Sequence, residues 1–253
     1  MVRLGQNFLA DTNLLGAIVR EADISPGDVV LEVGGGEGVL TRRLAAAGAE
    51  VHVVELDERL RAPLSEIADD APGVRLVIGD AMRIDLAALD PAPNLMVSNL
   101  PYSIATPLLL RTIAELPGLT RWTVMVQREI ADRLRATPGT KAYGSPSVVA
   151  QLCCRVEMLR AVDPAVFRPR PRVGSALLRL ERIAPWPGDR VAAVVRGAFA
   201  HRRKALARSL GIAGVASRER ALAALAAAEL PAAARAEELA PLDFARLAEE
   251  LGG

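Results

Sequence analysis

The sequence predicts an α/β fold with a mostly parallel sheet, followed by a smaller helical domain. Short apolar runs alternate with helical patterns through the first two thirds of the chain, which is the order of a parallel sheet covered by helices on both faces. After residues 185–188 the chain becomes rich in Ala, Leu, Arg and Glu at helical spacing. We therefore expect a main domain over residues 1–184 and a helical domain over residues 185–253.

Five runs are predicted to form the parallel strands: residues 29–33, 51–55, 74–78, 94–98 and 122–126. Two later strands, about 155–161 and 175–181, are joined by a proline-rich segment without a helix, so we expect them to pair antiparallel. The C-terminal domain should hold about four short helices. The Gly- and Thr-containing segment 137–144 is predicted to be a mobile loop.

Composition excludes several classes of protein. Of the 253 residues, 51% are hydrophobic and 24% are charged, which is typical of a globular chain rather than a disordered one. No apolar run reaches the ~18 residues of a membrane span. The first residues lack the apolar stretch of a signal peptide, and we expect a cytoplasmic monomer without membrane contact. With two adjacent cysteines and two distant histidines, the sequence predicts no metal site.

Charge is distributed unevenly along the chain. Residues 151–212 carry 13 Lys and Arg against 4 Asp and Glu, a net charge of +9, although the whole chain carries only +1. Arginine dominates this block, and its guanidinium group suits bidentate contacts with phosphate. A basic region on a nearly neutral protein indicates selective nucleic-acid binding, with a solvated helical face as the alternative.

A donor site is predicted where the first strands end. The first strand runs into an E-x-G-x-G-x-G motif over residues 32–38, where Gly34 and Gly36 allow the backbone to approach a ligand closely. A dinucleotide-binding loop would instead have G-x-G-x-x-G. The observed spacing favours S-adenosylmethionine, which has no pyrophosphate. A plain tight turn is the alternative for the glycines alone.

Two acids at the next strand ends strengthen this interpretation. Glu55 closes the second strand, where its carboxylate can accept hydrogen bonds from the ribose hydroxyls. Asp80, followed by Ala81, comes directly after the third strand and is placed to bind the adenine. Each acid alone is also compatible with a helix cap. Together with the glycines they predict a methyl-donor site.

The acceptor site is predicted at the end of the fourth strand, in the sequence Asn99-Leu100-Pro101-Tyr102. An exocyclic amine of adenine is a poor nucleophile, because its lone pair is delocalised into the ring. Asn99 and the Leu100 carbonyl can accept its two hydrogens, Pro101 can direct that carbonyl, and Tyr102 offers a ring for stacking. Such catalysis depends on positioning in a preorganised polar site.

Two further segments are candidates for RNA contact. Phe167 lies in a proline-rich loop and is predicted to cover the second face of a base stacked on Tyr102, with packing in the core as the alternative. Basic side chains flank it and recur where the helical domain begins, and we expect them to hold phosphates. These are Arg168, Arg170 and Arg172, followed by Arg202, Arg203 and Lys204.

With these residues in place, the chain resembles the small-subunit rRNA adenine dimethyltransferases along its whole length. Six blocks match in order: residues 4–9, 32–41, 99–102, 127–133, 167–173 and 199–204. The resemblance implies a Rossmann-like class I S-adenosylmethionine-dependent methyltransferase fold with a C-terminal helical RNA-binding domain. It implies N6,N6-dimethylation of two adjacent adenosines near the 3′ end of the small-subunit (16S) rRNA, late in subunit biogenesis. On this analogy Asn7 and Leu9 of the N-terminal segment touch the donor, along with Gly34, Glu55, Asp80 and Asn99. The partners that the resemblance implies are the small ribosomal subunit and its rRNA.

The chain departs from the family pattern at three places. Gly35 stands where the family commonly has proline, and Gly174 stands where many members have aspartate. The basic extension often found before residues 6–9 is reduced to Arg3. These departures put the stiffness of the glycine loop, one hydrogen bond and part of the RNA affinity in question.

Three other functions remain open from the sequence. A large-subunit rRNA adenine methyltransferase shares the donor motif and the Asn-x-Pro-Tyr turn, although the blocks at 127–133 and 202–204 favour the small-subunit group. A non-catalytic assembly factor with the same fold would bind ribosomes without methyl transfer. An NAD-dependent dehydrogenase is the third alternative.

Overall fold

The structure, a computed structural model, describes residues 8, 9 and 11–252. The chain divides into two compact units. The first comprises residues 1–131 and 157–182, and the second comprises 132–156 and 183–253. The division between residues 182 and 183 lies close to the predicted boundary after residue 184. The segment 132–156, which the sequence analysis assigned to the main domain, packs with the second unit.

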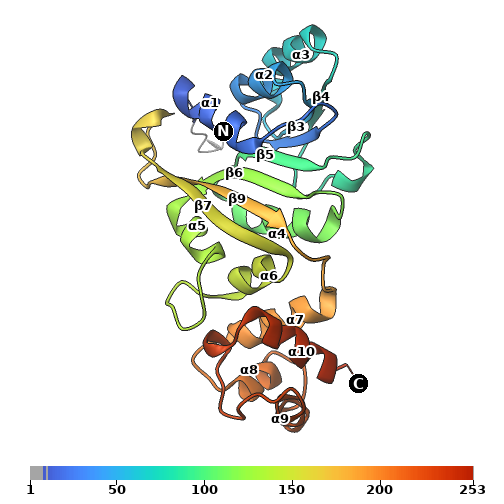
Figure 1. Cartoon of the computed structure of the whole chain (residues 1–253), viewed down its shortest axis with the longest axis vertical. Coiled ribbons are helices and arrows are strands. Elements are labelled where there is room, and N and C mark those ends of the chain that lie inside the picture. Colours follow the sequence, from blue (N-terminus) through green and yellow to red (C-terminus); the bar gives the residue numbers. More distant parts are fainter. Residues whose placement is uncertain (1–7, 10, 253) are drawn as a thin grey trace. The chain divides into compact units, whose positions relative to one another are not determined.

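A large mixed sheet forms the centre of the first unit (Figure 1). Its order is β4-β3-β2-β5-β6-β9-β7. The pairs β2–β3, β3–β4, β2–β5 and β5–β6 are parallel, and β9 runs antiparallel to β6. The strands are β2 (Val29–Val33), β3 (Glu50–Glu55), β4 (Val74–Ile78), β5 (Leu95–Asn99), β6 (Arg121–Gln127), β7 (Cys154–Val162) and β9 (Ser175–Arg182). The predicted parallel strands are all present, and the two later strands are neighbours in the sheet.

Helices follow the strands as the apolar spacing predicts. The helical elements that follow or precede these strands are α1 (Thr12–Ala22), α2 (Val39–Ala46), η1 (Glu58–Leu60), α3 (Arg61–Asp70), η2 (Leu86–Ala88), α4 (Ala105–Glu115), α5 (Arg128–Leu134) and η3 (Pro164–Val166). Helix α1 begins at Asp11, whose carboxylate accepts a hydrogen bond from the Leu14 N–H at 2.8 Å. Helix α2 packs against β3 and α3 against β4. All five residues of β2 are buried, as expected for a central parallel strand.

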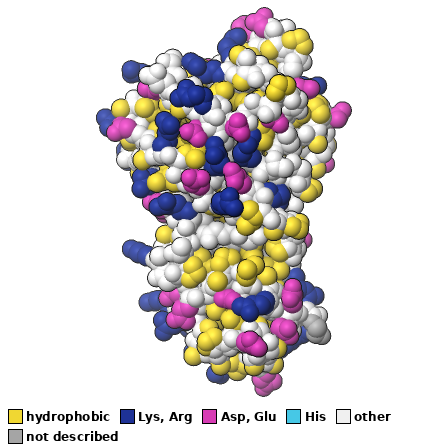
Figure 2. Space-filling model, in the orientation of Figure 1, with side chains coloured by type: hydrophobic (Ala, Val, Ile, Leu, Met, Phe, Trp, Pro, Cys, Tyr) yellow, Lys and Arg dark blue, Asp and Glu magenta, His cyan; other side chains and the backbone are white. Residues whose placement is uncertain are grey.

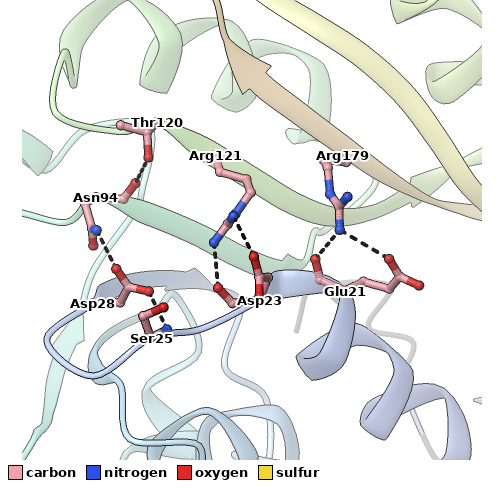
Figure 3. A network of polar contacts seen from close by, with 8 residues as sticks. All are labelled: Glu21, Asp23, Ser25, Asp28, Asn94, Thr120, Arg121 and Arg179. Atoms are coloured by element: carbon pink, nitrogen blue, oxygen red, sulfur yellow. Dashed lines mark hydrogen bonds and ion pairs between the residues drawn. The ribbon is translucent and has the colours of Figure 1, made fainter.

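Polar contacts fix the amino ends of the central strands (Figure 3). Asn94, directly before β5, donates to Asp28 at 2.7 Å and accepts from the Val29 N–H at 2.8 Å. Arg121 at the start of β6 donates to the Asp23 carbonyl at 2.7 Å, at the end of α1. These bonds satisfy polar groups at the end of the sheet where the strands begin. The carboxyl ends of β2, β3 and β5 lie at the opposite end of the sheet.

A second, two-stranded sheet joins distant parts of the chain. Strand β1 (Phe8–Leu9) pairs antiparallel with β8 (Phe167–Arg168). Leu9 and Phe167 are partners in this sheet and both belong to the buried core, which also contains Leu15 and Met125. The pairing therefore brings the N-terminal segment and the proline-rich segment to the same place.

The second unit is helical. It contains α6 (Ser145–Cys153), α7 (Asp189–Ala200), α8 (Leu206–Ile212), α9 (Arg218–Ala227), η4 (Ala236–Glu238) and α10 (Pro241–Glu250). Phe244 of α10 is fully buried and stacks at a tilt on Phe199 of α7, with ring centroids 5.7 Å apart. Packing of this kind holds a small helical core together.

The segment 137–144, predicted to be a mobile loop, is exposed over residues 137–142 and has a buried anchor at Tyr143. Tyr143 is fully buried, and its hydroxyl donates to the Leu239 carbonyl at 2.8 Å. The Tyr143 ring also meets Phe199 edge-on at 5.8 Å. Glycine and threonine predict loop geometry, but one buried aromatic ring with a hydrogen bond is enough to anchor such a loop.

None of the helices in the described part of the chain has the length and apolar character of a membrane span.

Candidate active site

A cavity of about 300 Å³ lies at the carboxyl ends of β2, β3 and β5. This is the edge where ligands bind in open α/β sheets. Its lining includes the glycine loop after β2, Glu55 from β3 and the turn from Asn99 to Ser103 after β5. Residues predicted from sequence for the donor and for the acceptor therefore face one cavity.

The glycine loop lies close to its neighbours because Gly34, Gly35 and Gly36 have no side chains. Gly34 has a φ of +83°, and a Cβ there would lie 3.2 Å from the Pro101 ring. Gly36 has a φ of +57°, and its Cβ would lie 3.2 Å from the Phe8 ring. Both positions favour glycine for conformation and for space. The glycine loop thus packs directly against the turn over residues 99–102, where the sequence predicts the acceptor.

Gly35, where the family commonly has proline, lies over β3. A Cβ at this position would be 2.4 Å from Cγ1 of Val53, which is fully buried. The loop in this chain therefore approaches the sheet more closely than a side chain would allow. Gly174, where many family members have aspartate, has no side chain that could form a hydrogen bond. Its carbonyl accepts a hydrogen bond from the Arg128 N–H at 2.9 Å.

Glu55 is held by two backbone groups. One carboxylate oxygen accepts from the Gly36 N–H and the other from the Asp57 N–H, both at 2.9 Å. The side chain is buried and lines the cavity. Each carboxylate oxygen can accept a further hydrogen bond, so Glu55 can bind ligand hydroxyls while it orders the glycine loop.

Glu32, the first residue of the E-x-G-x-G-x-G motif, is a second buried acid that lines this cavity. It is 1% exposed, and Thr41 donates to it at 2.7 Å. Burial raises the pKa of Glu32 to about 8; the Thr41 hydrogen bond opposes this rise, and the charge of Glu55 adds to it. The carboxyl is therefore largely protonated at neutral pH.

The charge of the cavity fits the predicted donor. Three carboxyl side chains line it, the largely protonated Glu32 and the acids Glu37 and Glu55, and no Lys, Arg or His does among the residues that the structure describes. Such a site suits a ligand with a cationic sulfonium and an ammonium group. The acidic lining disfavours a dinucleotide, because a pyrophosphate requires hydrogen-bond donors or positive charge. No cluster of metal ligands occurs within residues 8, 9 and 11–252.

The acceptor turn is fixed at both ends. The Leu100 N–H donates to the Met125 carbonyl at 3.0 Å, which ties the turn to β6. The Tyr102 hydroxyl lies 2.7 Å from the Ser175 hydroxyl of β9. Asn99 lines the cavity beside these residues. The turn is therefore preorganised, and both Asn99 and Tyr102 line the same cavity.

Other predicted donor residues occupy different places. Leu9 lines the cavity, whereas Asn7 lies outside the described residues. Asp80 and Ala81 follow β4 and do not line the cavity. Asp80 accepts from the Met82 N–H at 2.9 Å and pairs with Arg83 at 3.4 Å. Its role toward adenine stays a prediction.

Several lining residues were not assigned from sequence, among them Phe8 of β1, which borders Gly36, and Leu15 of α1. The signal for Phe8 was available, because the chain has only eight aromatic residues (four Phe, two Tyr and two Trp). Phe167, assigned to base stacking, is 2% exposed and packs in the core. This placement matches the alternative that we left open for it, and stacking would require the ring to leave the core.

The predicted RNA-binding arginines differ in their surroundings. Arg168 and Arg172 are exposed, and Arg170 forms an exposed ion pair with Asp163 at 3.7 Å. Arg202 is engaged within the second unit: it donates to Glu237 at 2.7 Å and to the Lys141 carbonyl at 2.8 Å. Arg203 and Lys204 line a separate hollow.

Comparisons with known proteins identify the family. The family model described as ribosomal RNA adenine dimethylase matches residues 2–252. The ribosomal RNA small subunit methyltransferase A of Rubrobacter xylanophilus is 45% identical over 97% of this chain and 92% of its own length. The protein of the same name from Rhodococcus opacus is 44% identical over 97% of this chain and 87% of its own.

Solved structures agree with this fold. A dimethyladenosine transferase from Plasmodium falciparum superposes with a TM-score of 0.81 over 95% of both chains, at 23% identity, which bears on the fold alone. The 23S rRNA methyltransferase ErmE has a TM-score of 0.69 and 30% identity over 98% of this chain and 100% of its own. The predicted class I methyltransferase fold and the predicted donor, S-adenosylmethionine, are confirmed. This chain belongs to the ribosomal RNA adenine dimethylase family.

Proposed function

We propose that this chain transfers methyl groups from S-adenosylmethionine to N6 of two adjacent adenosines near the 3′ end of the small-subunit (16S) rRNA. One observation carries the proposal: a single cavity is lined by the glycine loop with Glu55 and by the Asn99–Tyr102 turn. Direct transfer requires the reacting atoms to approach within about 3–3.5 Å. A common cavity for donor and acceptor supports such an approach.

The donor would be held by the glycine loop and Glu55, with Leu9 and Phe8 beside it. When bound, it supplies a methyl carbon made electrophilic by its positive sulfur. The carboxyl side chains of the cavity favour that positive charge over the neutral sulfur of the product. This difference favours release of the product after transfer.

The acceptor would be oriented by Asn99 and Leu100. The Asn99 side-chain oxygen and the Leu100 carbonyl accept the two hydrogens of the adenine amine and turn its lone pair toward the methyl carbon. The nitrogen loses one proton to water for each methyl group that it gains. Tyr102 stacks on the base, and the Ser175 hydroxyl 2.7 Å from its own fixes the ring. Positioning by preformed polar groups accounts for the rate.

The small subunit is favoured over the large one by sequence similarity. Relatives named ribosomal RNA small subunit methyltransferase A are 45% and 44% identical, whereas the 23S rRNA methyltransferase ErmE is 30% identical. We accordingly propose the small ribosomal subunit and its rRNA as partners, with action late in subunit biogenesis. The enzyme would work as a cytoplasmic monomer without membrane contact.

The test is transfer of labelled methyl groups to purified unmethylated small and large subunits, followed by nucleoside analysis of each rRNA. We expect N6,N6-dimethyladenosine in the small-subunit rRNA at two neighbouring positions. Product confined to the large subunit would overturn the choice of substrate. Binding to small subunits without any transfer would indicate a non-catalytic assembly factor.

A further inference from the structure

Arg111 of α4 is hydrogen-bonded to the loop that follows β4. Its Nη1 donates to the Ala81 carbonyl at 2.7 Å, and its Nη2 donates to the Ile84 carbonyl at 2.9 Å. Its Nε donates to Glu115, one turn further along the same helix, at 2.7 Å. Glu115 thus orients the guanidinium group, and the two terminal nitrogens bridge the ends of the segment 81–84.

The surroundings of Arg111 differ from those of a surface arginine. On the face drawn in Figure 2, basic and acidic side chains are intermixed, and ion pairs between exposed groups contribute little to stability. The Arg111 side chain, by contrast, is only 16% exposed. A guanidinium group withdrawn from water needs partners for its donors, and two of these partners are carbonyls of one loop. Ala81 is buried as well, so water would replace the lost donor at its carbonyl poorly.

The loop begins beside a residue of the active-site cavity. Ile78, the last residue of β4, is the partner of Glu55 in the parallel sheet, and the Gly79 N–H donates to the Glu55 carbonyl at 2.8 Å. Asp80 follows directly, and its Oδ1 accepts from the Met82 N–H at 2.9 Å. A carboxylate retains further acceptor capacity after one such bond. Asp80 can therefore still accept a hydrogen bond from the exocyclic amine of an adenine.

The segment 80–84 is a tight turn whose orientation depends on contacts outside it. Within the turn, the Asp80 carbonyl accepts from the N–H groups of Arg83 and Ile84, at 2.8 and 3.0 Å. These bonds fix the shape of the turn but not its direction relative to the sheet. Gly79 ties the start of the turn to β3, and Arg111 ties the rest of it to α4. Two such attachments hold the turn before a ligand binds, which reduces the ordering cost of binding.

The helix that carries Arg111 begins at the predicted acceptor turn. The Ile104 N–H donates to the Pro101 carbonyl at 3.2 Å, and α4 starts at Ala105. Ala105 and Leu108 are fully buried, so the helix is anchored in the core. One helix therefore carries both the end of the turn that would orient the acceptor base and the arginine that holds the loop after β4.

We propose that Arg111 is a positioning residue for methyl transfer: it holds the segment 80–84 so that Asp80 binds the adenine of the donor. This inference rests on the proposed function, because it takes the cavity as the donor site and Asp80 as the acid that recognises the donor base. Arg111 itself does not line the cavity. It acts through the loop and touches neither the donor nor the acceptor.

The test measures how strongly the full chain prefers a ligand that bears adenine. Calorimetry gives the affinities for S-adenosylhomocysteine and for S-inosylhomocysteine, in which an oxygen replaces the exocyclic amine. We expect the wild type to prefer adenine by at least about tenfold, because the other base presents an oxygen to the Asp80 carboxylate. D80N should lose this preference, since an amide can face either base. R111Q should bind S-adenosylhomocysteine about tenfold more weakly and lose most of the preference.

R182Q is the matched control. Arg182 of β9 donates to the carbonyls of Ile113, Leu116 and Leu119 at the C-terminal end of α4, at 3.1, 3.1 and 2.7 Å, and it does not line the cavity. R182Q therefore also removes an arginine that binds backbone carbonyls. We expect both R182Q and R111Q to lower the midpoint of urea unfolding, whereas R182Q should keep the wild-type affinity and base preference.

Methyl transfer to small subunits gives a second readout. R111Q should raise KM for S-adenosylmethionine about tenfold and leave kcat at saturating donor within about twofold of the wild-type value. R182Q should leave both near the wild-type values. A merely structural role for Arg111 would lower stability in the same way as R182Q without this separation of KM from kcat.

A wild-type adenine preference in R111Q would overturn the proposal. A wild type that binds both ligands equally, or a D80N variant that keeps the preference, would overturn it as well, because the loop would then not recognise the base. Equal losses of donor affinity in R111Q and R182Q would assign the effect to stability alone and have the same consequence. Failure of the proposed function is distinguishable, because the wild type would then transfer no methyl groups to small subunits whatever its base preference.

Discussion

The Glu55 carboxylate accepts a hydrogen bond from the backbone N–H of Gly36 at 2.9 Å. The bond joins the end of β3 to the glycine loop after β2, and it makes one side chain responsible for both the shape of the loop and a wall of the cavity. The second carboxylate oxygen of Glu55 accepts a hydrogen bond from the Asp57 N–H. The carboxylate is thus fixed without any basic side chain lining the cavity among the described residues.

Replacing Glu55 with Gln should weaken donor binding by at least tenfold, or about 1.4 kcal/mol. An amide offers one oxygen where two backbone N–H groups now find acceptors, so one of them loses its hydrogen bond. Calorimetric titration with S-adenosylmethionine measures the effect, and affinity for small subunits should be unchanged. An equal loss of donor and subunit affinity would contradict the assigned role.

Replacing Asn99 with Ala should leave donor affinity near the wild-type value and reduce methyl transfer about a hundredfold or more. The variant lacks the oxygen that accepts an amine hydrogen, although the turn remains tied to β6 through Leu100. S103A is the matched control, because Ser103 lines the same cavity. Single-turnover transfer to small subunits separates the variants, and equal rates for N99A and S103A would refute the amine contact.

Glu32 predicts a pH-dependent stability. Its pKa is about 8 in the folded chain and 4.5 in the unfolded one, so between these values the folded state binds more protons. The free energy of unfolding therefore falls as pH rises through this window, by up to about 1.4 kcal/mol for each unit of the pKa difference.

The variant E32Q removes this dependence. We expect its Tm, relative to that of the wild type, to increase by several degrees between pH 4.5 and a pH above 8. Thermal unfolding followed by circular dichroism at a series of pH values checks the change. A constant Tm difference across the series would show that Glu32 keeps an ordinary pKa in the folded chain.

Glycine is required at position 38, the last glycine of the motif, by packing as well as by backbone conformation. Gly38 has a φ of +75°, and a Cβ there would lie 2.0 Å from Cδ1 of the buried Ile67. Gly48 has a φ of +92° with nothing within 4 Å. Alanine at either site meets the left-handed strain of about 1–2 kcal/mol.

G38A should therefore destabilise the chain more than G48A, by about a further 1–3 kcal/mol from overpacking. Urea unfolding of both variants measures the difference at equal backbone strain. Matching midpoints would mean that Ile67 moves aside without cost, and that only the backbone requires glycine in this loop.

Local sequence was enough to place most of the predicted donor and acceptor residues at one cavity. Apolar runs mark the central strands, and the predicted strand 29–33 is β2. Once the strands are in order, Gly34, Glu55 and Asn99 must lie at one edge of the sheet, because parallel strands end on the same side. No knowledge of long-range contacts was needed for that step.

Long-range pairing was not predictable. Strands β1 and β8 have two residues each, too few to carry a periodic pattern, and the burial of Phe167 follows from their pairing. Arg202 and its partner Glu237 are separated by 34 intervening residues, so its structural role leaves no local signal. The anchoring of Tyr143 by Leu239 is invisible for the same reason.

The most direct test is a crystal structure of the chain with S-adenosylmethionine. We expect the donor within the cavity of the first unit, with its ribose hydroxyls on Glu55 and its methyl carbon facing the Asn99 side chain. A donor bound away from Asn99, with the glycine loop and Glu55 free of it, would show that methyl transfer does not take place in this cavity.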